Sequence, residues 1–255
     1  MTDRPLALVT GGLHRVGAAI AARLANAGYA LALHQRSSVQ MDGGLQSALE
    51  ETGAAHQSFI ADLADPAAVA ELIPAISQHF SRAPDLLVNN ASLFIEGEWP
   101  DLSQQALVDT MQVNHHAPVM LAQAVVSAHQ GPRRPVIVNI LDQRIANPVP
   151  DQLAYSLSKQ ALWQSTRTLA VAFGAQARVN GVAPGLTLPT PDYSDAQMAR
   201  LAALMPLGAL PTPEQIADAV AFLAQAEAIT GQVIFVDGGA HMTSFDRDFV
   251  QLERD

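Results

Sequence analysis

The 255-residue chain has no cysteine, and it has few basic residues. Without cysteine, a disulfide framework is excluded, and no thiolate is available as a metal ligand or a nucleophile. Lysine and arginine together number 14 against 24 acidic residues, which gives a formal net charge of −10. A general nucleic-acid binder is therefore not expected, because neutralising phosphates requires clustered basic side chains.

A long hydrophobic run is also missing from the start of the chain. Residues 1–5 lead directly into the apolar run 6–9, which is too short for the core of a signal peptide or for a membrane span. The absence of cysteine fits a reducing compartment. We therefore expect a soluble cytoplasmic protein whose partner is a small molecule, not a membrane or a nucleic acid.

Hydrophobic residues make up 49% of the chain, enough for a large core at this length. Short runs rich in leucine, valine and isoleucine alternate with longer alanine-rich stretches. The strand candidates are residues 6–9, 30–34, 86–89, 136–140, 178–182 and 232–236, with one more strand expected before Ala61. The helix candidates are residues 16–27, 65–80, 103–129, 153–173 and 213–225.

Apolar strands joined by helical crossovers predict a parallel sheet that is covered by helices on both faces. No repeat, low-complexity tract or linker divides the chain, so we expect a single domain over residues 1–255. The proline-rich stretch 184–213 comes nearest to a break, but an apolar strand candidate follows it. We interpret residues of about 186–212 as a substrate loop or lid.

A glycine-rich turn, residues 10–17, joins the first strand to the first helix. Such a turn brings backbone N–H groups and the positive end of the helix dipole up to a pyrophosphate. Gly11 would allow the tight turn, and Gly17 would allow close packing of helix on strand. Arg15 stands where many such loops have glycine, and it either places a positive charge beside phosphate and substrate or is simply exposed. Read alone, the turn could be only a tight connection; its place at the first strand–helix junction favours dinucleotide binding.

The end of the second strand predicts which nicotinamide cofactor is used. An NAD site places an acid there to accept hydrogen bonds from the ribose hydroxyls, and residues 33–38 contain none. Arg36 and Ser37 instead offer a charge-assisted fork and a hydroxyl to a 2′-phosphate. The sequence therefore predicts NADPH, with a merely exposed Arg36 and NADH as the alternative. Asp62 is expected on the adenine amino group, and residues 89–91 beside the ribose and nicotinamide.

These segments together resemble the short-chain dehydrogenase/reductase family over essentially the whole chain. The matching pieces are the glycine loop, Asn89-Asn90-Ala91, Asn114, Tyr155-x-x-x-Lys159, Pro184-Gly185 and Asp237-Gly238-Gly239. The resemblance implies a Rossmann-like three-layer α/β sandwich with a seven-stranded parallel sheet, assembled as a dimer or, as we expect, a homotetramer. It also implies that the cofactor is bound by Gly11, Arg15, Val16, Gly17, His34, Arg36, Ser37, Asp62, Leu63, Asn90, Ala91, Ser92, Lys159, Pro184 and Gly185.

Tyr155 and Lys159 are four residues apart and so share one face of the 153–173 helix. Reduction by hydride also needs a proton, and tyrosine, with an ordinary pKa of about 10, is a poor acid–base group at neutral pH. The lysine charge would stabilise the phenolate. By resemblance, Lys159 also holds the nicotinamide ribose, and Asn114 is a catalytic residue that supports a water chain to this lysine.

Asp142 lies thirteen residues before Tyr155, where members of the family normally have serine. That serine donates a hydrogen bond to the substrate carbonyl, whereas an ionised aspartate only accepts. Next to an oxygen that becomes negative, at about 4 Å and an effective dielectric near ~20, a carboxylate costs about 4 kcal/mol. This cost is roughly three decades in rate. A substrate with N–H donors, or with a ring nitrogen that needs a proton, would instead gain from the carboxylate.

The trio of Asp142, Tyr155 and Lys159 is similar to that of the pteridine reductases and of the bacterial dihydromonapterin reductases, which carry aspartate at this position. In the pteridine reductases an aromatic residue at the position of Phe94 sandwiches the pterin against the nicotinamide, and stacking suits a flat heteroaromatic ring. The resemblance implies NADPH-dependent reduction of dihydropterins or dihydrofolate, with hydride to C7 or C6 and a proton to N8 or N5. The implied substrate contacts are Arg15, Ser92, Phe94, Asp142, Tyr155 and Leu186. The 186–212 loop does not match that subgroup closely.

Two other functions remain open. The first is a carbonyl reductase for a ketone or 3-oxoacyl substrate, in which Asp142 is protonated and donates as serine would. The second is an NADP-sensing protein without turnover, which would have no need of the proton-relay residues. No metal is expected: the adjacent His115 and His116 would point about 100° apart on a helix, and no further ligand follows at metal-site spacing.

Overall fold

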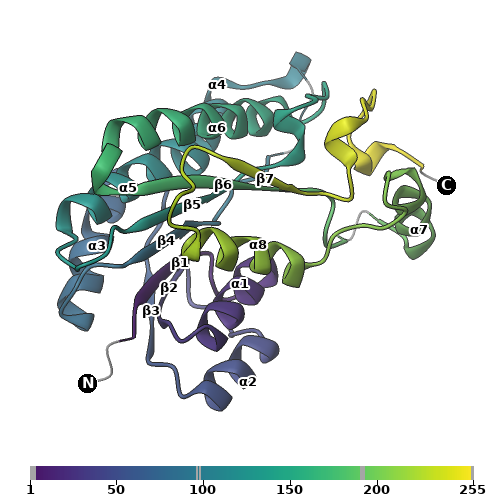
Figure 1. Cartoon of the computed structure of the whole chain (residues 1–255). Coiled ribbons are helices and arrows are strands. Elements are labelled where there is room, and N and C mark those ends of the chain that lie inside the picture. The colour runs from purple at the N-terminus through teal and green to yellow at the C-terminus, as the bar shows by residue number, and fades with distance from the viewer. Residues whose placement is uncertain (1–3, 96, 98, 190–192, 254–255) are drawn as a thin grey trace.

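The computed structural model describes residues 4–95, 97, 99–189 and 193–253 (Figure 1). Its seven strands form one parallel sheet in the order β3-β2-β1-β4-β5-β6-β7. The predicted seven-stranded sheet is thereby confirmed. The strands are β1 (Leu6–Thr10), β2 (Ala30–Gln35), β3 (His56–Ile60), β4 (Leu86–Asn89), β5 (Val136–Ile140), β6 (Arg178–Pro184) and β7 (Val233–Val236).

Helices cover both faces of the sheet and make a three-layer sandwich (Figure 1). On one face α1, α2 and α8 pack together, and on the other α3 packs on α5 while α4 packs on α6. Two buried apolar clusters fill the spaces between the sheet and these two helical layers. The helices are α1 (Arg15–Asn26), α2 (Gly43–Thr52), α3 (Pro66–Phe80), α4 (Gln104–Met111), α5 (Ala117–Ala128), α6 (Leu153–Phe173), α7 (Asp195–Leu204) and α8 (Pro213–Gln225). No helix among the described residues is long and apolar enough to cross a membrane.

Local sequence signals explain where several helices begin. Asp42 caps α2 by accepting from the backbone N–H groups of Gly44 and Leu45. The side chain of Thr212 accepts from the backbone of Gln215, whose side chain in turn accepts from the Thr212 backbone, forming a capping box at the start of α8. These contacts satisfy N–H groups that a helix leaves unpaired in its first turn.

The sequence-based elements differ from the structure at three places. Helices α2 and α7 had no counterpart among the helix candidates, and α7 lies within the predicted substrate loop. The single helix expected at 103–129 is divided into α4 and α5 by one π-helical turn at Gln112–His116. Such a turn inserts an extra residue into the helix and is frequently found at functional sites. Here it contains Asn114, whose side chain is buried and points away from solvent.

The strand order places the carboxyl ends of the central strands around one cleft. Strand β1 has β2 on one side and β4 on the other, so the connections run in opposite directions from this point. Ligands of open α/β sheets bind outside the carboxyl ends at such a switch point. Gly11, Asn90, Leu141 and Gly185 each directly follow one of the strands β1, β4, β5 and β6.

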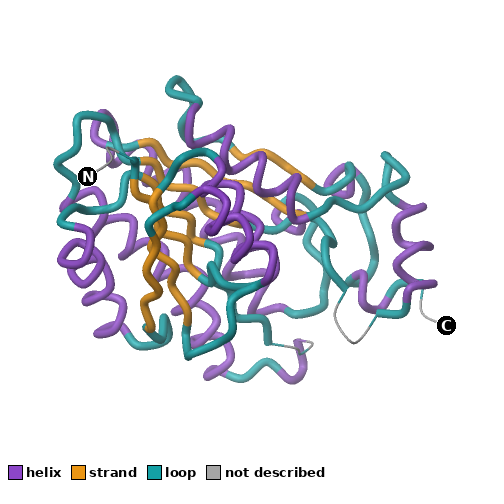
Figure 2. The backbone as a smooth tube through the Cα atoms, turned by 90° about the horizontal axis from the view of Figure 1, so that it is seen from below, coloured by secondary structure: helices purple, strands orange, loops and turns teal. Residues whose placement is uncertain are grey.

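The C-terminal segment, residues 237–253, follows β7 and lies beyond these strand ends, beside α7 (Figure 1). Figure 2 shows the same end of the chain outside the layer of strands, at one edge of the molecule. Leu201 of α7 and Phe249 belong to a separate buried cluster, which joins the segment to the predicted 186–212 loop. Residues 190–192 of that loop lie outside the described part of the chain.

Candidate active site

The first part of the site is a cavity of about 840 Å³ at the carboxyl ends of β1, β2 and β4. Most of the predicted cofactor residues meet here. The cavity is lined by Gly11, Arg15, Val16, Gly17, His34, Arg36, Asp62, Leu63, Asn90, Ala91 and Ser92, together with residues not named for this role. Ser37 is exposed and outside this lining, so its contact with a 2′-phosphate stays a prediction.

The glycine-rich turn brings the start of α1 very close to the end of β1. A Cβ on Gly17 would lie 2.0 Å from the carbonyl oxygen of Gly11, so no side chain fits at this close approach. His14, at the N-cap of α1, gives no side-chain hydrogen bond to the helix. The N–H groups of the first turn therefore remain available to an anionic ligand. These features fit a dinucleotide at this turn.

Arg15 adopts a backbone conformation that favours glycine, with φ of 52°. This explains why related loops have glycine here, and such a non-glycine conformation is a frequent property of functional sites. The side chain of Arg15 is exposed, lines both cavities of the site and donates to the carbonyl of Leu188 at 3.5 Å. The arginine is thus both exposed and directed to the predicted substrate loop.

His34, on β2, connects two loops at the cofactor cavity. Its Nδ1 accepts from the Gly11 N–H at 3.2 Å, and its Nε2 donates to the carbonyl of Ala61 at 2.9 Å. Burial lowers the pKa of His34 below its usual 6.5, outweighing the raising effect of the Ala61 hydrogen bond. Both contacts require a neutral ring with its proton on Nε2. His34 therefore holds the glycine-rich turn in place, in addition to its predicted contact with the cofactor.

We expect affinity for NADPH to fall when His34 is protonated, because a protonated Nδ1 cannot accept from Gly11. Stability follows the same direction: the unfolded histidine gains its proton near 6.5, whereas the folded one stays neutral to lower pH. The stabilisation that neutral His34 gives to the folded state is complete above about pH 6.5. It is lost as the pH falls from there toward the lower pKa of the folded histidine. Measuring Kd for NADPH between about pH 5 and about 8 tests this expectation.

The matched control is His34→Gln, whose side chain can accept from Gly11 and donate to Ala61 without titrating. Titration of the cofactor phosphate affects both proteins equally, so the difference between their pH curves belongs to His34. Identical curves would show that the histidine has no such role.

The second part of the site is an adjoining cavity of about 510 Å³, which shares Arg15, Asn90 and Phe94 with the first. It is lined by all of the predicted catalytic and substrate residues except Asn114, namely Arg15, Ser92, Phe94, Asp142, Tyr155, Lys159 and Leu186, and by Val16, Pro184 and Gly185 from the predicted cofactor set. Asn90 of the predicted cofactor set and Thr187, Leu188 and Tyr193 of the predicted substrate loop also line it. The remaining lining comes from residues for which the sequence suggested no role, Arg144, Gln152, Asp248, Phe249 and Val250 among them.

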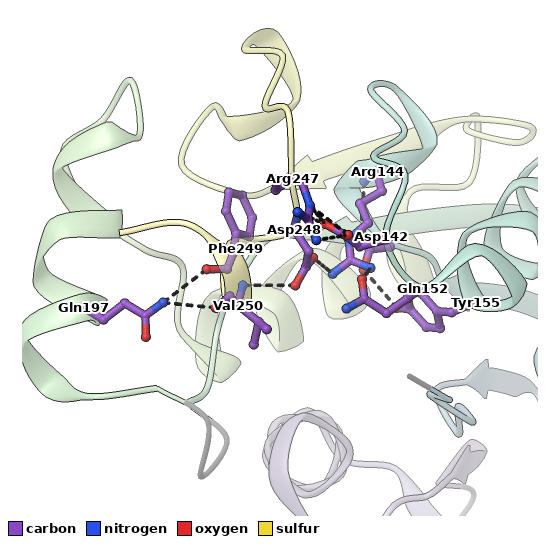
Figure 3. A network of polar contacts seen from close by, with 10 residues as sticks. Asp142, Arg144, Gln152, Tyr155, Gln197, Arg247, Asp248, Phe249 and Val250 are labelled. Atoms are coloured by element: carbon purple, nitrogen blue, oxygen red, sulfur yellow. Dashed lines mark hydrogen bonds and ion pairs between the residues drawn. The ribbon is translucent and has the colours of Figure 1, made fainter. Parts of the chain in front are cut away.

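Asp142 and Tyr155 are directly hydrogen-bonded in this cavity (Figure 3). Asp142 follows β5, and its Oδ2 accepts from the Tyr155 hydroxyl at 2.9 Å. Its other oxygen, Oδ1, accepts from the backbone N–H of Arg144 at 2.8 Å. Both carboxyl oxygens therefore have a donor on the protein, and the phenol proton points to the carboxylate.

Burial changes the acid–base properties of the two helix α6 residues. The pKa of Tyr155 is raised well above its usual value of 10, first by burial and then by the charge of Asp142. Burial lowers the pKa of Lys159 to about 8. The Lys159 Nζ donates to the carbonyl of Ile140 at 2.8 Å and lies 5.6 Å from the centre of the Tyr155 ring. Burial and Asp142 therefore act on the Tyr155 pKa in the direction opposite to the expected effect of lysine, and the stabilisation of a phenolate by Lys159 stays a prediction.

Phe94 is the exposed aromatic wall of the cavity. Its ring is 4.9 Å from the Tyr155 ring, at an angle of 60° between the planes, and the residue is 48% exposed. Large apolar side chains are usually covered, so an exposed ring at the edge of a cavity offers a surface to a ligand.

Asn114 fixes the loop that carries Ser92 and Phe94. Its side chain accepts from the backbone N–H of Leu93 at 2.7 Å and donates to the Leu93 carbonyl at 2.8 Å. It also donates to the Ser158 hydroxyl at 3.0 Å on α6. Within the described residues it has no hydrogen bond to Lys159, so the water chain to this lysine stays a prediction.

The adjacent histidines bind different neighbours. His115 contacts the Ser165 hydroxyl through Nε2 at 2.8 Å, and His116 contacts the side chain of Gln112 at 3.3 Å. Over the described ranges of the chain, histidines, aspartates and glutamates form no group of three that could hold a metal ion.

Known proteins match this chain over most of its length. Residues 12–241 match the model of a family described as enoyl-(acyl carrier protein) reductase. The 3-oxoacyl-(acyl-carrier-protein) reductase FabG of Escherichia coli (strain K12) is 31% identical over 242 residues, covering 93% of this chain and 97% of the relative.

Solved structures give the same result. FolM alternative dihydrofolate reductase 1 of Brucella canis, complexed with NADP, is 34% identical with a TM-score of 0.86, covering 94% of this chain and 95% of that one. A short-chain dehydrogenase/reductase of Serratia marcescens is 31% identical with a TM-score of 0.83, covering 92% and 97%. The matching family model, the near-complete coverage and the shared fold show that this protein belongs to the short-chain dehydrogenase/reductase family of oxidoreductases.

Proposed function

We propose that the protein is an NADPH-dependent pteridine reductase that converts dihydropterins or dihydrofolate to their tetrahydro forms. The observation that carries the proposal is the Asp142 carboxyl group, hydrogen-bonded to the Tyr155 hydroxyl inside the cavity. The half-exposed Phe94 beside them supports a flat aromatic substrate. The FolM dihydrofolate reductase with NADP, at 34% identity, is a relative of this type.

The cofactor cavity fits NADPH. The turn between Gly11 and Gly17 would hold the pyrophosphate, and Arg36 at the cavity edge would hold the 2′-phosphate. Lys159, which also lines the adjoining cavity, would hold the nicotinamide ribose. When bound, the cofactor supplies a hydride to the substrate ring. The protein must supply the matching proton and exclude water.

Tyr155 is the proton donor in this proposal. Its raised pKa keeps the hydroxyl protonated at neutral pH, so the O–H group is available to a ring nitrogen of the substrate. Asp142 orients that hydroxyl and accepts hydrogen bonds from N–H groups of the substrate. The phenolate that forms after transfer lies near two cations, Lys159 and Arg144, at 5.6 Å and 5.5 Å from the tyrosine ring.

The charge of Asp142 favours a nitrogen substrate over a carbonyl. Reduction of a ketone builds negative charge on oxygen, and a carboxylate about 4 Å away opposes this by about 4 kcal/mol at an effective dielectric near ~20. A ring nitrogen that takes up a proton builds no such charge. The same side chain therefore slows ketone reduction and assists pterin reduction.

A direct assay tests the proposal by following NADPH oxidation with dihydropterins, dihydrofolate, simple ketones and a 3-oxoacyl thioester. We expect the wild type to reduce the pterins. Asp142→Ser should lower kcat/KM for them by about 10–10²-fold, because the acceptor for substrate N–H groups is lost, and should raise ketone reduction. If the wild type reduces ketones or thioesters and no pterin, the proposal is wrong. Absence of any NADPH oxidation, with NADPH still bound, would favour a sensing protein.

The second candidate is a reductase of 3-oxoacyl substrates. The 31% identity with FabG and the family description favour it. It requires Asp142 to be protonated, so that the side chain donates to the developing oxyanion as serine would. In the structure both Asp142 oxygens instead accept hydrogen bonds, from the Tyr155 hydroxyl and the Arg144 backbone N–H, which is why we place this function second. The homotetramer that the family resemblance implies, built from single-domain subunits, is tested by sedimentation of the purified protein.

A further inference from the structure

Two ion pairs cross between the segment that follows β5 and the C-terminal segment (Figure 3). Arg144 of the first segment pairs with Asp248 of the second, and Arg247 of the second pairs with Asp151 of the first. Arg247 Nε lies 3.0 Å and 3.1 Å from the two Asp151 oxygens, one of which also accepts from the Asp248 backbone N–H at 2.6 Å. The C-terminal segment is thereby fixed against the catalytic aspartate's own loop.

The two pairs differ in their relation to the substrate cavity. Arg144 and Asp248 both line it, whereas Arg247 and Asp151 are absent from its lining. The Arg144 side chain is only 10% exposed, and that of Asp248 only 2%. A buried guanidinium is costly unless it is paired and hydrogen-bonded, and Asp248 and the Gln152 side chain at 3.3 Å provide those contacts.

The Arg144 guanidinium also faces the catalytic groups. Its Nε lies 3.8 Å from Asp142 Oδ1. Its central carbon is 5.8 Å from the centre of the Phe94 ring and 5.5 Å from that of Tyr155, on the wall of the same cavity. One buried cation thus lies between two carboxyl groups, Asp142 and Asp248, and a charge this close acts strongly on both.

We propose that Arg144 is a positioning residue that holds Asp142 in its ionised form and aims it at Tyr155, and that Asp248 of the C-terminal segment competes for the same guanidinium. The inference rests on the proposed role of Asp142 in choosing the substrate. The Arg144–Asp248 pair then sets specificity: with the guanidinium present, the site accepts N–H donors; without it, Asp142 takes up a proton more readily and the site becomes one that donates to a carbonyl.

Among the described residues, charged or titratable groups face Asp142 from three segments. Tyr155 and Lys159 face it from α6, Arg144 from its own segment and Asp248 from the C-terminal segment. Lys159 and Arg144 carry the charge opposite to that of an Asp142 carboxylate, whereas Asp248 carries the same charge. Burial raises the pKa of Asp248, and Arg144 counters that rise, which is consistent with one cation shared between two acids.

The test compares Arg144→Met, Asp248→Asn and, as the matched control, Arg247→Met in the NADP-bound protein. Protonation of Asp142 is read from its carboxyl carbon by NMR of protein labelled with ¹³C-aspartate, with Asp142→Asn to assign the signal. We expect Arg144→Met to raise the midpoint of this signal by about one unit or more, since an opposite charge at this distance lowers it by about that amount. Asp248→Asn should lower the midpoint, and Arg247→Met should leave it unchanged.

A merely structural role would give a different result. All three variants remove a contact of the same segment, so each is expected to lower the thermal unfolding temperature. Only a direct charge effect moves the Asp142 midpoint in opposite directions for Arg144→Met and Asp248→Asn. Shifts of the same sign, or no shift for Arg144→Met, would overturn the proposal. If a variant fails to fold, Arg144→Gln and Asp248→Ser replace it in the same measurement.

Turnover separates this inference from the proposed function. If the proposed function and the proposed role of Arg144 are both correct, Arg144→Met raises the ratio of ketone kcat/KM to pterin kcat/KM by about tenfold or more. This factor is in proportion to a midpoint shift of about one pH unit. If the wild type reduces no pterin, the proposed function fails, and the carboxyl signal still decides the role of Arg144. If the midpoint moves as expected but the substrate ratio does not, Arg144 sets the charge of Asp142 without setting specificity.

Discussion

Replacing Tyr155 by phenylalanine is expected to lower kcat by about 10²–10⁴-fold, the usual contribution of a positioned proton donor. The hydroxyl is the group that reaches from α6 to Asp142 in the cavity, and its raised pKa makes it a proton donor at neutral pH. Phenylalanine keeps the ring and its contact with Phe94 but has no proton to give. Steady-state turnover of the best pterin substrate measures the effect.

Binding should distinguish a lost proton from a damaged site. The Tyr155→Phe variant should bind NADPH with a Kd within about twofold of the wild type, because the glycine turn and Arg36 are untouched. Tyr29→Phe is the control for loss of a phenol elsewhere: Tyr29 packs against the core cluster beside α1, outside both cavities, and should leave kcat unchanged. A Tyr155→Phe variant that retains more than about a tenth of kcat would show that another group supplies the proton.

The parts of this site that the sequence alone predicted are determined by residues that lie close together in the chain. Strand ends, the glycine turn and the Tyr155–Lys159 spacing are set by neighbouring residues, and the structure brings them together at the cleft. Helical spacing placed Tyr155 and Lys159 on one face, which the cavity confirms. Asp142 joined them because β5 and α6 bring residues thirteen positions apart within hydrogen-bonding distance.

The remaining parts depend on contacts that no local pattern encodes. Asp248 is 104 residues from Arg144 in the sequence, and only the folded chain places it in the cavity. No glycine or proline lies within the π-helical turn that positions Asn114, so one continuous helix was the natural expectation. The raised pKa of Tyr155 likewise depends on burial and on the charge of Asp142, which the spacing of Tyr155 and Lys159 does not reveal. Arg144 could have been noticed in the sequence because it lies two residues after Asp142. Its proposed role, however, depends on Gln152 and Asp248, which the fold brings to its guanidinium.

Replacing Lys159 by methionine is expected to stabilise the protein while nearly abolishing activity. Burial lowers the pKa of Lys159 from 10.5 to about 8, so keeping it charged at neutral pH costs the folded state about 3 kcal/mol. Methionine avoids this cost, and the lost hydrogen bond to the Ile140 carbonyl offsets about 1 kcal/mol of the gain. We therefore expect a gain of about 2 kcal/mol in the free energy of unfolding at neutral pH. Urea unfolding of both proteins measures it.

The difference in stability between the wild type and Lys159→Met is expected to depend on pH. Below about pH 8 lysine is charged in both folded and unfolded chains, and the full cost is present. Between about 8 and 10.5 the unfolded chain holds the proton while the folded one does not, so wild-type stability rises relative to the variant as the pH rises. Lys159 is the only lysine in the chain, so no other side-chain amine contributes to this difference.

Activity should move in the opposite direction. Without the cation beside the tyrosine ring, the phenolate formed during turnover loses its stabilisation, and kcat should fall by about 10²–10³-fold. Lys159→Arg keeps a charge and should show no comparable gain in stability, which separates the effect of charge from that of packing. If Lys159→Met is less stable than the wild type at every pH, the buried ammonium stabilises the folded protein and the prediction is wrong. An increase in stability together with the loss of activity would show that the fold bears the cost of this charge for the sake of the reaction.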